Sequence, residues 1–74
     1  MDLTITQKKV LKVLYENKDT HLKPLQISKK SGVNIHHVVQ ALTKFMNNDY
    51  VYQPTYEGEF LISPDGECAY QDSI

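Results

Sequence analysis

The chain has 74 residues, of which 41% are hydrophobic and 23% charged, and this mixture is typical of one small globular domain. A domain of this length has a small core and little room for an enclosed catalytic cleft. No apolar run approaches the roughly 20 residues that span a bilayer, and the N-terminal segment lacks the plan of a signal peptide. We therefore expect a single cytoplasmic domain, residues 1–74, without a membrane partner.

Charge is distributed unevenly, although the net charge is only −1. Residues 1–48 hold all eight lysines and three acidic residues, a net charge of +5, whereas residues 49–74 hold six acidic residues and no lysine. Arginine is absent. Arginine makes the commonest bidentate contact to guanine, so any nucleic acid bound by this chain would be bound without that contact.

The first predicted helix covers residues 3–19. Val10, Leu11 and Leu14 recur at helical spacing, and Thr4 or Thr6 can cap the start. Poor helix formers end it, and residues 20–22 are predicted to form a short extended segment.

A second helix is predicted between Lys23 and Gly32. Pro24 suits the first helical position, where its missing N–H is no loss, and Gly32 suits the left-handed residue just past the end. Ile27 is the best core candidate of this helix, and Leu25 is the second.

The third helix is predicted from about residue 35 to residue 47, with Asn34 as its N-cap. At about 100° per residue its main apolar side chains form one stripe, which consists of Val38, Ala41, Leu42 and Phe45. The polar face opposite carries His36, Gln40, Thr43 and Asn47, with Val39 on one flank and His37 and Lys44 on the other. We expect one core that contains Val10, Leu14, Ile27, Val33, Val38, Leu42 and Phe45.

Two β-prone runs, residues 50–53 and 59–62, are separated by the turn residues "PTYEG" and predict a hairpin. Ser63 as a cap and Pro64 in the first helical position then predict a short last helix. The predicted fold class is therefore α+β and mainly α, with three helices, a two-stranded hairpin and a short C-terminal helix.

This order of elements resembles a winged helix-turn-helix domain, whose signature is a short, glycine-containing turn between a short helix and a longer one. In "ISKKSGVNIHHVVQALTKFMNNDYV" the residues Gly32, Val33 and Asn34 stand where the family has its Gly-Val-Ser turn. Val38, Leu42 and Phe45 stand at the family's three apolar anchors of the recognition helix. The tail "FLISPDGECAY" resembles the end of the wing in small bacterial regulators of the MarR, PadR and ArsR type. The resemblance covers about residues 4–70, but Glu57 and Glu59 stand in the wing where the family often has a basic residue. Alternation along the strand puts both glutamates on one side of the hairpin tip, and we expect both to be exposed.

The resemblance implies a small sequence-specific DNA-binding protein, a transcriptional regulator of a bacterium or phage, acting as a monomer or weak homodimer. The third helix would lie in the major groove of double-stranded DNA. Gln40 would pair with adenine, while Thr43 and Val39 would contact thymine methyl groups. The remaining candidates would lie near the sugar-phosphate backbone or, for Tyr56, against it or a base: Lys23, Lys29, Lys30, His36, His37, Lys44 and Tyr56.

Other interpretations of the same residues stay open. The polar face of the third helix is also what any solvated amphipathic helix presents, and lysines are common on any surface. A winged-helix module that binds a protein rather than DNA is the second functional hypothesis, favoured by the acidic C-terminal part, the absence of arginine and the apolar Val39 on a flank of the third helix.

The sequence predicts neither an enzyme nor a cofactor or metal site. It has no glycine-rich phosphate loop and no nucleophile paired with a base. His21, His36, His37 and Cys68 lack the tight spacing of zinc ligands, and Cys68 is expected to be a buried or half-buried filler.

Overall fold

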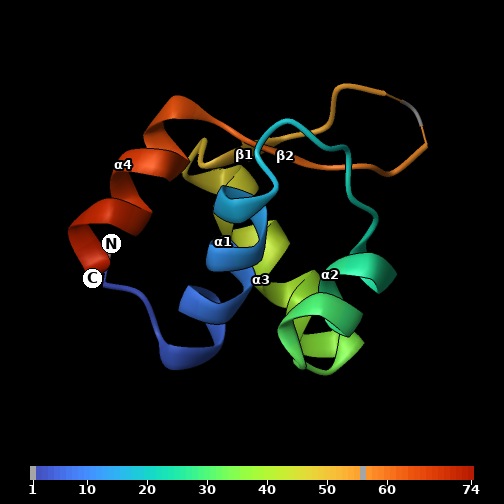
Figure 1. Cartoon of the computed structure of the whole chain (residues 1–74), viewed down its shortest axis with the longest axis horizontal. Helices are drawn as coiled ribbons and strands as arrows, with labels where there is room; N and C mark the ends of the chain where they lie inside the picture. The colour runs from blue at the N-terminus through green and yellow to red at the C-terminus, as the bar shows by residue number, and fades with distance from the viewer. Residues whose placement is uncertain (1, 56) are drawn as a thin grey trace.

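The computed structural model describes residues 2–55 and 57–74, and in this part of the chain it has four helices and one two-stranded antiparallel sheet (Figure 1). The prediction of an α+β, mainly helical fold is confirmed. In chain order the elements are α1 (Ile5–Glu16), α2 (Pro24–Ser31), α3 (Ile35–Asn47), β1 (Val51–Tyr52), β2 (Leu61–Ile62) and α4 (Pro64–Ser73).

Helix α1 begins with a reciprocal cap. The Thr4 side-chain oxygen accepts from the Gln7 backbone N–H at 3.1 Å, and the Gln7 side-chain oxygen accepts from the Thr4 backbone N–H at 3.0 Å. This capping box satisfies two N–H groups that have no partner within the helix, so Thr4 rather than Thr6 is the cap. The helix ends at Glu16, three residues earlier than predicted.

The connection between α2 and α3 has the predicted chemistry. Gly32 has a φ of +74°, in the left-handed region, and its N–H donates to the Ser28 carbonyl at 2.9 Å. The Ser28 hydroxyl in turn donates to the Val33 carbonyl at 2.5 Å. Asn34 then caps α3 by accepting the His36 backbone N–H at 2.9 Å. These bonds hold the start of α3 against the end of α2.

The hairpin is shorter than predicted and has a third participant. Val51 lies opposite Ile62, and Tyr52 lies opposite Leu61. Beyond this register, Leu22 and Phe60 exchange backbone hydrogen bonds of 3.2 and 2.7 Å. The segment before α2, predicted to be extended, is therefore attached to the chain that leads into β2.

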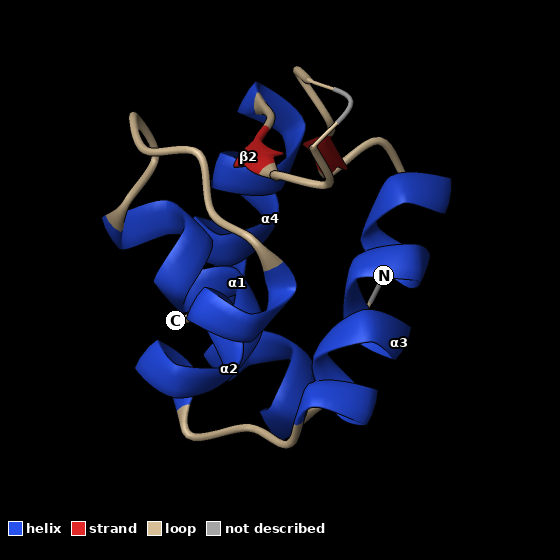
Figure 2. Ribbon diagram, turned by 90° about the vertical axis from the view of Figure 1, so that its right-hand side faces the viewer, coloured by secondary structure: helices blue, strands red, loops and turns tan. Residues whose placement is uncertain are grey.

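The core lies where α1, α2, α3 and the sheet meet, and all seven predicted core residues are buried in it. Figure 2 shows α3 along one side of the molecule, with the strands near one end of the helices. Leu25 is 58% exposed, so its prediction as a core residue is wrong. Residues two apart on a helix point in nearly opposite directions, and Ile27 takes the inward position. The other buried apolar residues are Leu11, Val13, Leu22, Ala41, Val51, Phe60 and Ile62.

Helix α4 packs against α1. The rings of Tyr15 and Tyr70 lie 4.8 Å apart between centroids, and the Gln71 side-chain N–H donates to the Tyr15 hydroxyl at 2.9 Å. Cys68 is exposed, so its predicted role as a filler is wrong. Ala69 and Tyr70 take the inward positions of that turn, which leaves Cys68 outside. None of the helices within residues 2–55 and 57–74 combines the length and apolarity needed to cross a bilayer.

Candidate nucleic-acid interface

Helix α3 presents one long exposed face. Its inward stripe packs in the core, as the sequence predicts. The outer positions predicted as site residues are all exposed: His36, His37, Val39, Gln40, Thr43 and Lys44. This outer face is therefore exposed over more than two turns of helix.

The two flanks of this face differ chemically. Val39 and Met46 are seven residues apart, lie on the same side of the helix and are both exposed, so they form an apolar flank. On the face itself, the Thr43 hydroxyl donates to the Val39 carbonyl at 2.9 Å. Its proton is thus engaged within the helix, and Thr43 keeps its acceptor lone pairs and its methyl group for an external contact.

The other flank of α3 borders a cleft of about 340 Å³. Its walls are the first turn of α1 and the middle of α3, and its lining residues are Thr4, Thr6, Gln7, His37, Gln40, Ala41 and Lys44. The side chains of His37, Gln40 and Lys44 form no hydrogen bond or ion pair with any described residue. The cleft thus gathers donors from two helices and has no carboxylate in its lining.

The contribution of α1 to this cleft was missed by sequence reasoning. The sequence predicts Thr4 and Thr6 only as helix caps. The sequence has no local signal for more, because the start of α1 meets α3 only through the packing of both helices in one core.

The three predicted lysines of α2 lie at its two ends. Lys23 is the N-cap residue, and its backbone N–H donates to the Gln26 side-chain oxygen at 2.8 Å, which leaves its exposed ammonium group uninvolved. Lys29 and Lys30 are exposed in the last turn. None of these ammonium groups is paired with a carboxylate of a described residue.

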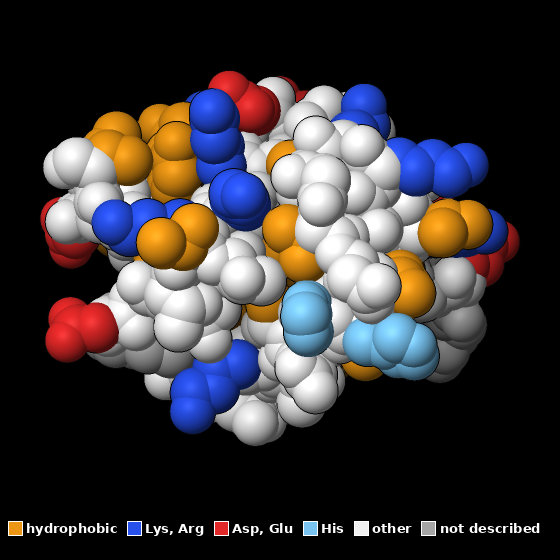
Figure 3. Space-filling model, turned by 90° about the horizontal axis from the view of Figure 1, so that it is seen from below, with side chains coloured by type: hydrophobic (Ala, Val, Ile, Leu, Met, Phe, Trp, Pro, Cys, Tyr) orange, Lys and Arg blue, Asp and Glu red, His pale blue; other side chains and the backbone are white. Residues whose placement is uncertain are grey.

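The surface of α2 and α3 carries no negative side chain, because residues 20–48 contain no aspartate or glutamate. Figure 3 shows one face of the molecule on which histidine side chains are exposed, lysines lie in several separate groups, and acidic side chains lie at the margins. The positive charge on this face is therefore divided into patches rather than joined in one unbroken stripe.

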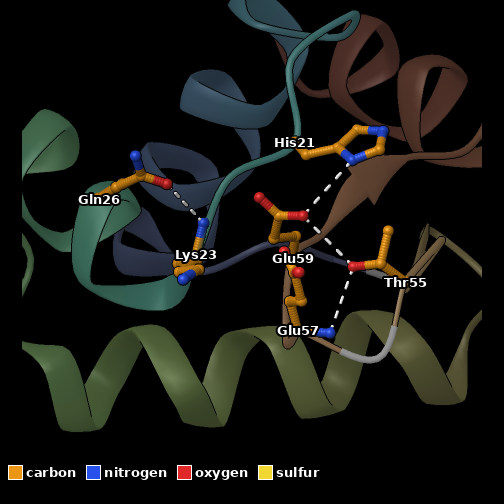
Figure 4. A network of polar contacts seen from close by, with 6 residues as sticks. All are labelled: His21, Lys23, Gln26, Thr55, Glu57 and Glu59. Carbon is orange, nitrogen blue, oxygen red and sulfur yellow. Dashed lines mark hydrogen bonds and ion pairs between the residues drawn. The ribbon is translucent and has the colours of Figure 1, made fainter.

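The loop between the strands holds two carboxylates in different surroundings. Glu57 is exposed, as expected, but the Glu59 side chain is only 20% exposed. One Glu59 oxygen lies 3.6 Å from His21 Nδ1 and accepts from the Thr55 hydroxyl at 3.2 Å (Figure 4). The expectation that both glutamates are exposed on one side is wrong for Glu59, because the Leu22–Phe60 pairing brings His21 alongside it.

Tyr56 and the possible metal ligands are the remaining candidate residues of the sequence. Tyr56, predicted as a contact at the loop tip, lies outside the described residues. Within the described ranges, no three histidine, cysteine, aspartate or glutamate side chains are grouped so that they could hold a metal ion.

Comparison of the chain with models of protein families, with curated proteins and with solved structures gave no match.

Proposed function

We propose that this chain is a winged helix-turn-helix protein that binds double-stranded DNA, with α3 in the major groove. The observation that carries the proposal is the exposed outer face of α3 within a stretch, residues 20–48, that has lysines and no acidic residue. Phosphate contacts dominate the affinity of proteins for DNA, so a surface that has lysines and no carboxylate favours DNA as the ligand. The major groove is wide enough to admit an α-helix such as α3. We further propose that it acts as a transcriptional regulator, as a monomer or weak homodimer.

The base-reading residues would be those at the middle of the outer face of α3. Gln40 has an uncommitted side-chain amide, which can donate to and accept from the major-groove edge of adenine. Thr43 keeps its methyl group for a thymine methyl, because its hydroxyl proton is used within the helix. Val39, on the apolar flank, offers a second contact of this kind.

Phosphate groups would be held on both sides of that face. Lys29 and Lys30 would contact one strand from the end of α2. In the cleft beside α1, His37 and Lys44 would contact a phosphate, with the Thr6 hydroxyl as a further donor. His36 would lie near the same backbone, and Lys23 would extend the contact at the start of α2. These contacts fix the register of α3 and carry no sequence information of their own.

Substitutions on α3 and α2 should have different effects on DNA binding. In the proposed complex, Gln40→Ala removes a base contact and should reduce the preference for one base pair by about 1–3 kcal/mol. Lys29→Ala and Lys30→Ala should weaken binding to all sequences alike, each lowering the slope of log affinity against log salt by about 1. Fluorescence anisotropy with random duplexes and with a selected duplex, at several salt concentrations, measures both effects.

A matched control for the lysine variants is Lys18→Ala. Lys18 follows the end of α1, and its Nζ atom lies 3.6 Å from a carboxylate oxygen of Glu67. It is not among the residues proposed to contact DNA. Wild-type protein that binds no duplex would exclude the proposed function. DNA binding that is unchanged in all three interface variants would instead place the DNA on another surface.

The loop between the strands would act as a wing that stands away from the DNA backbone, because Glu57 repels phosphate. We expect Glu57→Gln to tighten non-specific binding to duplex DNA, most clearly at low salt, where charges are least screened. Asp72→Asn is the control, since it removes one exposed negative charge from α4 and changes the net charge equally. Equal effects of the two variants in an anisotropy titration would mean that only net charge matters. Glu59 is not a suitable site for this test, because its carboxylate is bonded within the loop.

A second candidate function is a module that binds a protein and not DNA. The division of the lysines into separate patches on the face in Figure 3 and the apolar flank of Val39 and Met46 favour it. Under this alternative Val39→Asp weakens a protein complex, while no duplex binds at any salt concentration. The anisotropy titration of the wild-type protein therefore separates the two candidates directly.

A further inference from the structure

A second exposed feature lies on the outer side of α1, away from the proposed interface. A groove of about 310 Å³ runs between this side and the last turn of α4, and its lining residues are Ile5, Lys8, Lys9, Lys12, Tyr70 and Ile74. Ile5 is 76% exposed and Ile74 is 83% exposed. Among the large hydrophobic side chains of the described residues these two are the most exposed, and they lie at one groove.

The groove has an apolar floor and a positive rim. Ile5, Lys9 and Lys12 are spaced by four and three residues and thus lie along one side of α1, beside Lys8. Lysine stems cover apolar surface while their ammonium groups stay in water. None of the three lysines is paired with a carboxylate of a described residue, and no acidic residue lines the groove.

The walls of the groove are held in place by contacts between α1, the segment that follows it, and α4. The Tyr15 and Tyr70 rings pack at 4.8 Å, and Gln71 donates to the Tyr15 hydroxyl at 2.9 Å. Lys18 and Glu67 lie 3.6 Å apart at the other end of α4. A ligand would therefore meet two helices already packed together, and little backbone entropy would be lost in forming the site.

We propose that this groove docks a segment of a partner protein that carries apolar side chains flanked by aspartate or glutamate. The exposed isoleucines would cover the apolar side chains, and the three unpaired ammonium groups would select carboxylates at the edges. An amphipathic helix laid into a groove is a common form of such recognition. DNA offers phosphates to the lysines but only scattered methyl groups to the two isoleucines, so an acidic protein segment with apolar side chains fits the whole groove better. This inference is independent of the function proposed for α3.

The test uses a synthetic helical peptide with leucines along one face and glutamates on the others, labelled for fluorescence anisotropy. We expect the intact chain to bind it and to bind a matched peptide with lysine in place of every glutamate at least about tenfold more weakly. Ile5→Ser, and separately Lys8→Glu combined with Lys12→Glu, should each weaken binding of the acidic peptide by about tenfold or more. Both changes affect exposed side chains, and urea unfolding checks that the fold is retained.

The matched controls are Leu25→Ser and the combination of Lys29→Glu with Lys30→Glu, which alter exposed residues of the same kinds on α2. They should leave binding of the acidic peptide unchanged. Equal binding of the acidic and the lysine peptides, or groove variants that bind like the wild type, would overturn the proposal. Self-association in sedimentation that Ile5→Ser abolishes would assign the groove to a second copy of the chain instead. Loss of duplex DNA binding in the Lys8 and Lys12 variant, with peptide binding intact, would assign the rim to nucleic acid.

Discussion

Replacement of Leu42 by alanine is expected to lower the free energy of unfolding by about 2–5 kcal/mol. Leu42 is only 2% exposed and lies in the inward stripe of α3, between Val38 and Phe45. The substitution removes buried methyl groups and leaves a cavity, because neighbouring side chains of a close-packed core relax only in part. A domain of 74 residues is stable by roughly 4–11 kcal/mol, so the loss is a large share of the total.

Urea unfolding followed by circular dichroism measures this loss as a lower midpoint with an unchanged slope. Val39→Ala is the matched control, because Val39 lies on the same helix but is exposed, and its change should stay within about 0.5 kcal/mol. A Leu42→Ala loss as small as that of Val39→Ala would mean that α3 is turned about its axis. The face proposed to contact DNA would then be the wrong one.

Replacement of Gly66 by alanine is expected to destabilise the fold by about 1–3 kcal/mol. A Cβ atom at this position would lie 2.1 Å from the Tyr50 carbonyl oxygen and 2.8 Å from Ile62 Cγ1. The Tyr50 carbonyl is itself held in place, since it accepts the Ser63 backbone N–H at 2.9 Å. The first turn of α4 therefore has to move away from Tyr50, in the segment between α3 and β1, to admit the methyl group.

The expected loss of stability for Gly66→Ala is opposite in sign to the usual effect of replacing a helical glycine by alanine. In an exposed helix, alanine in place of glycine stabilises by about 0.5–1 kcal/mol, through lower backbone entropy in the unfolded chain. Cys68→Ala, at an exposed position of α4, controls for changes in helix propensity and should be close to neutral or slightly stabilising. An increase in the urea midpoint for Gly66→Ala would show that α4 does not pack closely on Tyr50.

Local chemistry in the sequence predicts most of the helical part of this protein. Pro24, Gly32 and Asn34 act at helix ends through their own backbone or side-chain geometry, and such effects extend over only a few residues. The phase of α3 follows from the spacing of its apolar residues alone, because a helix turns by about 100° per residue whatever it packs against. The amino-acid sequence by itself therefore determines the outer face of α3, and with it the candidate contacts on that helix.

Positions that depend on two distant segments were decided only by the tertiary structure. The pairing of Leu22 with Phe60 puts His21 beside Glu59, and no spacing within either segment indicates this. The close approach of Gly66 to Tyr50 has the same origin. Such contacts form only when several elements share one core, because the free energy of burial comes from the whole set of apolar surfaces and not from one segment.

Each candidate site has a part that the sequence predicts and a part that only the tertiary structure shows. Sequence periodicity predicts Gln40, Thr43 and Lys44 on the outside of α3, but the cleft that Gln40 and Lys44 share with Thr6 exists only because α1 packs across α3. The groove between Ile5 and Ile74 joins residues at opposite ends of the chain. The spacing of apolar residues in the sequence indicates which side of a helix or strand is buried. Which helix or strand packs against that side depends on how all the apolar surfaces fit together in the core. This packing therefore decides which polar side chains lie close to one another.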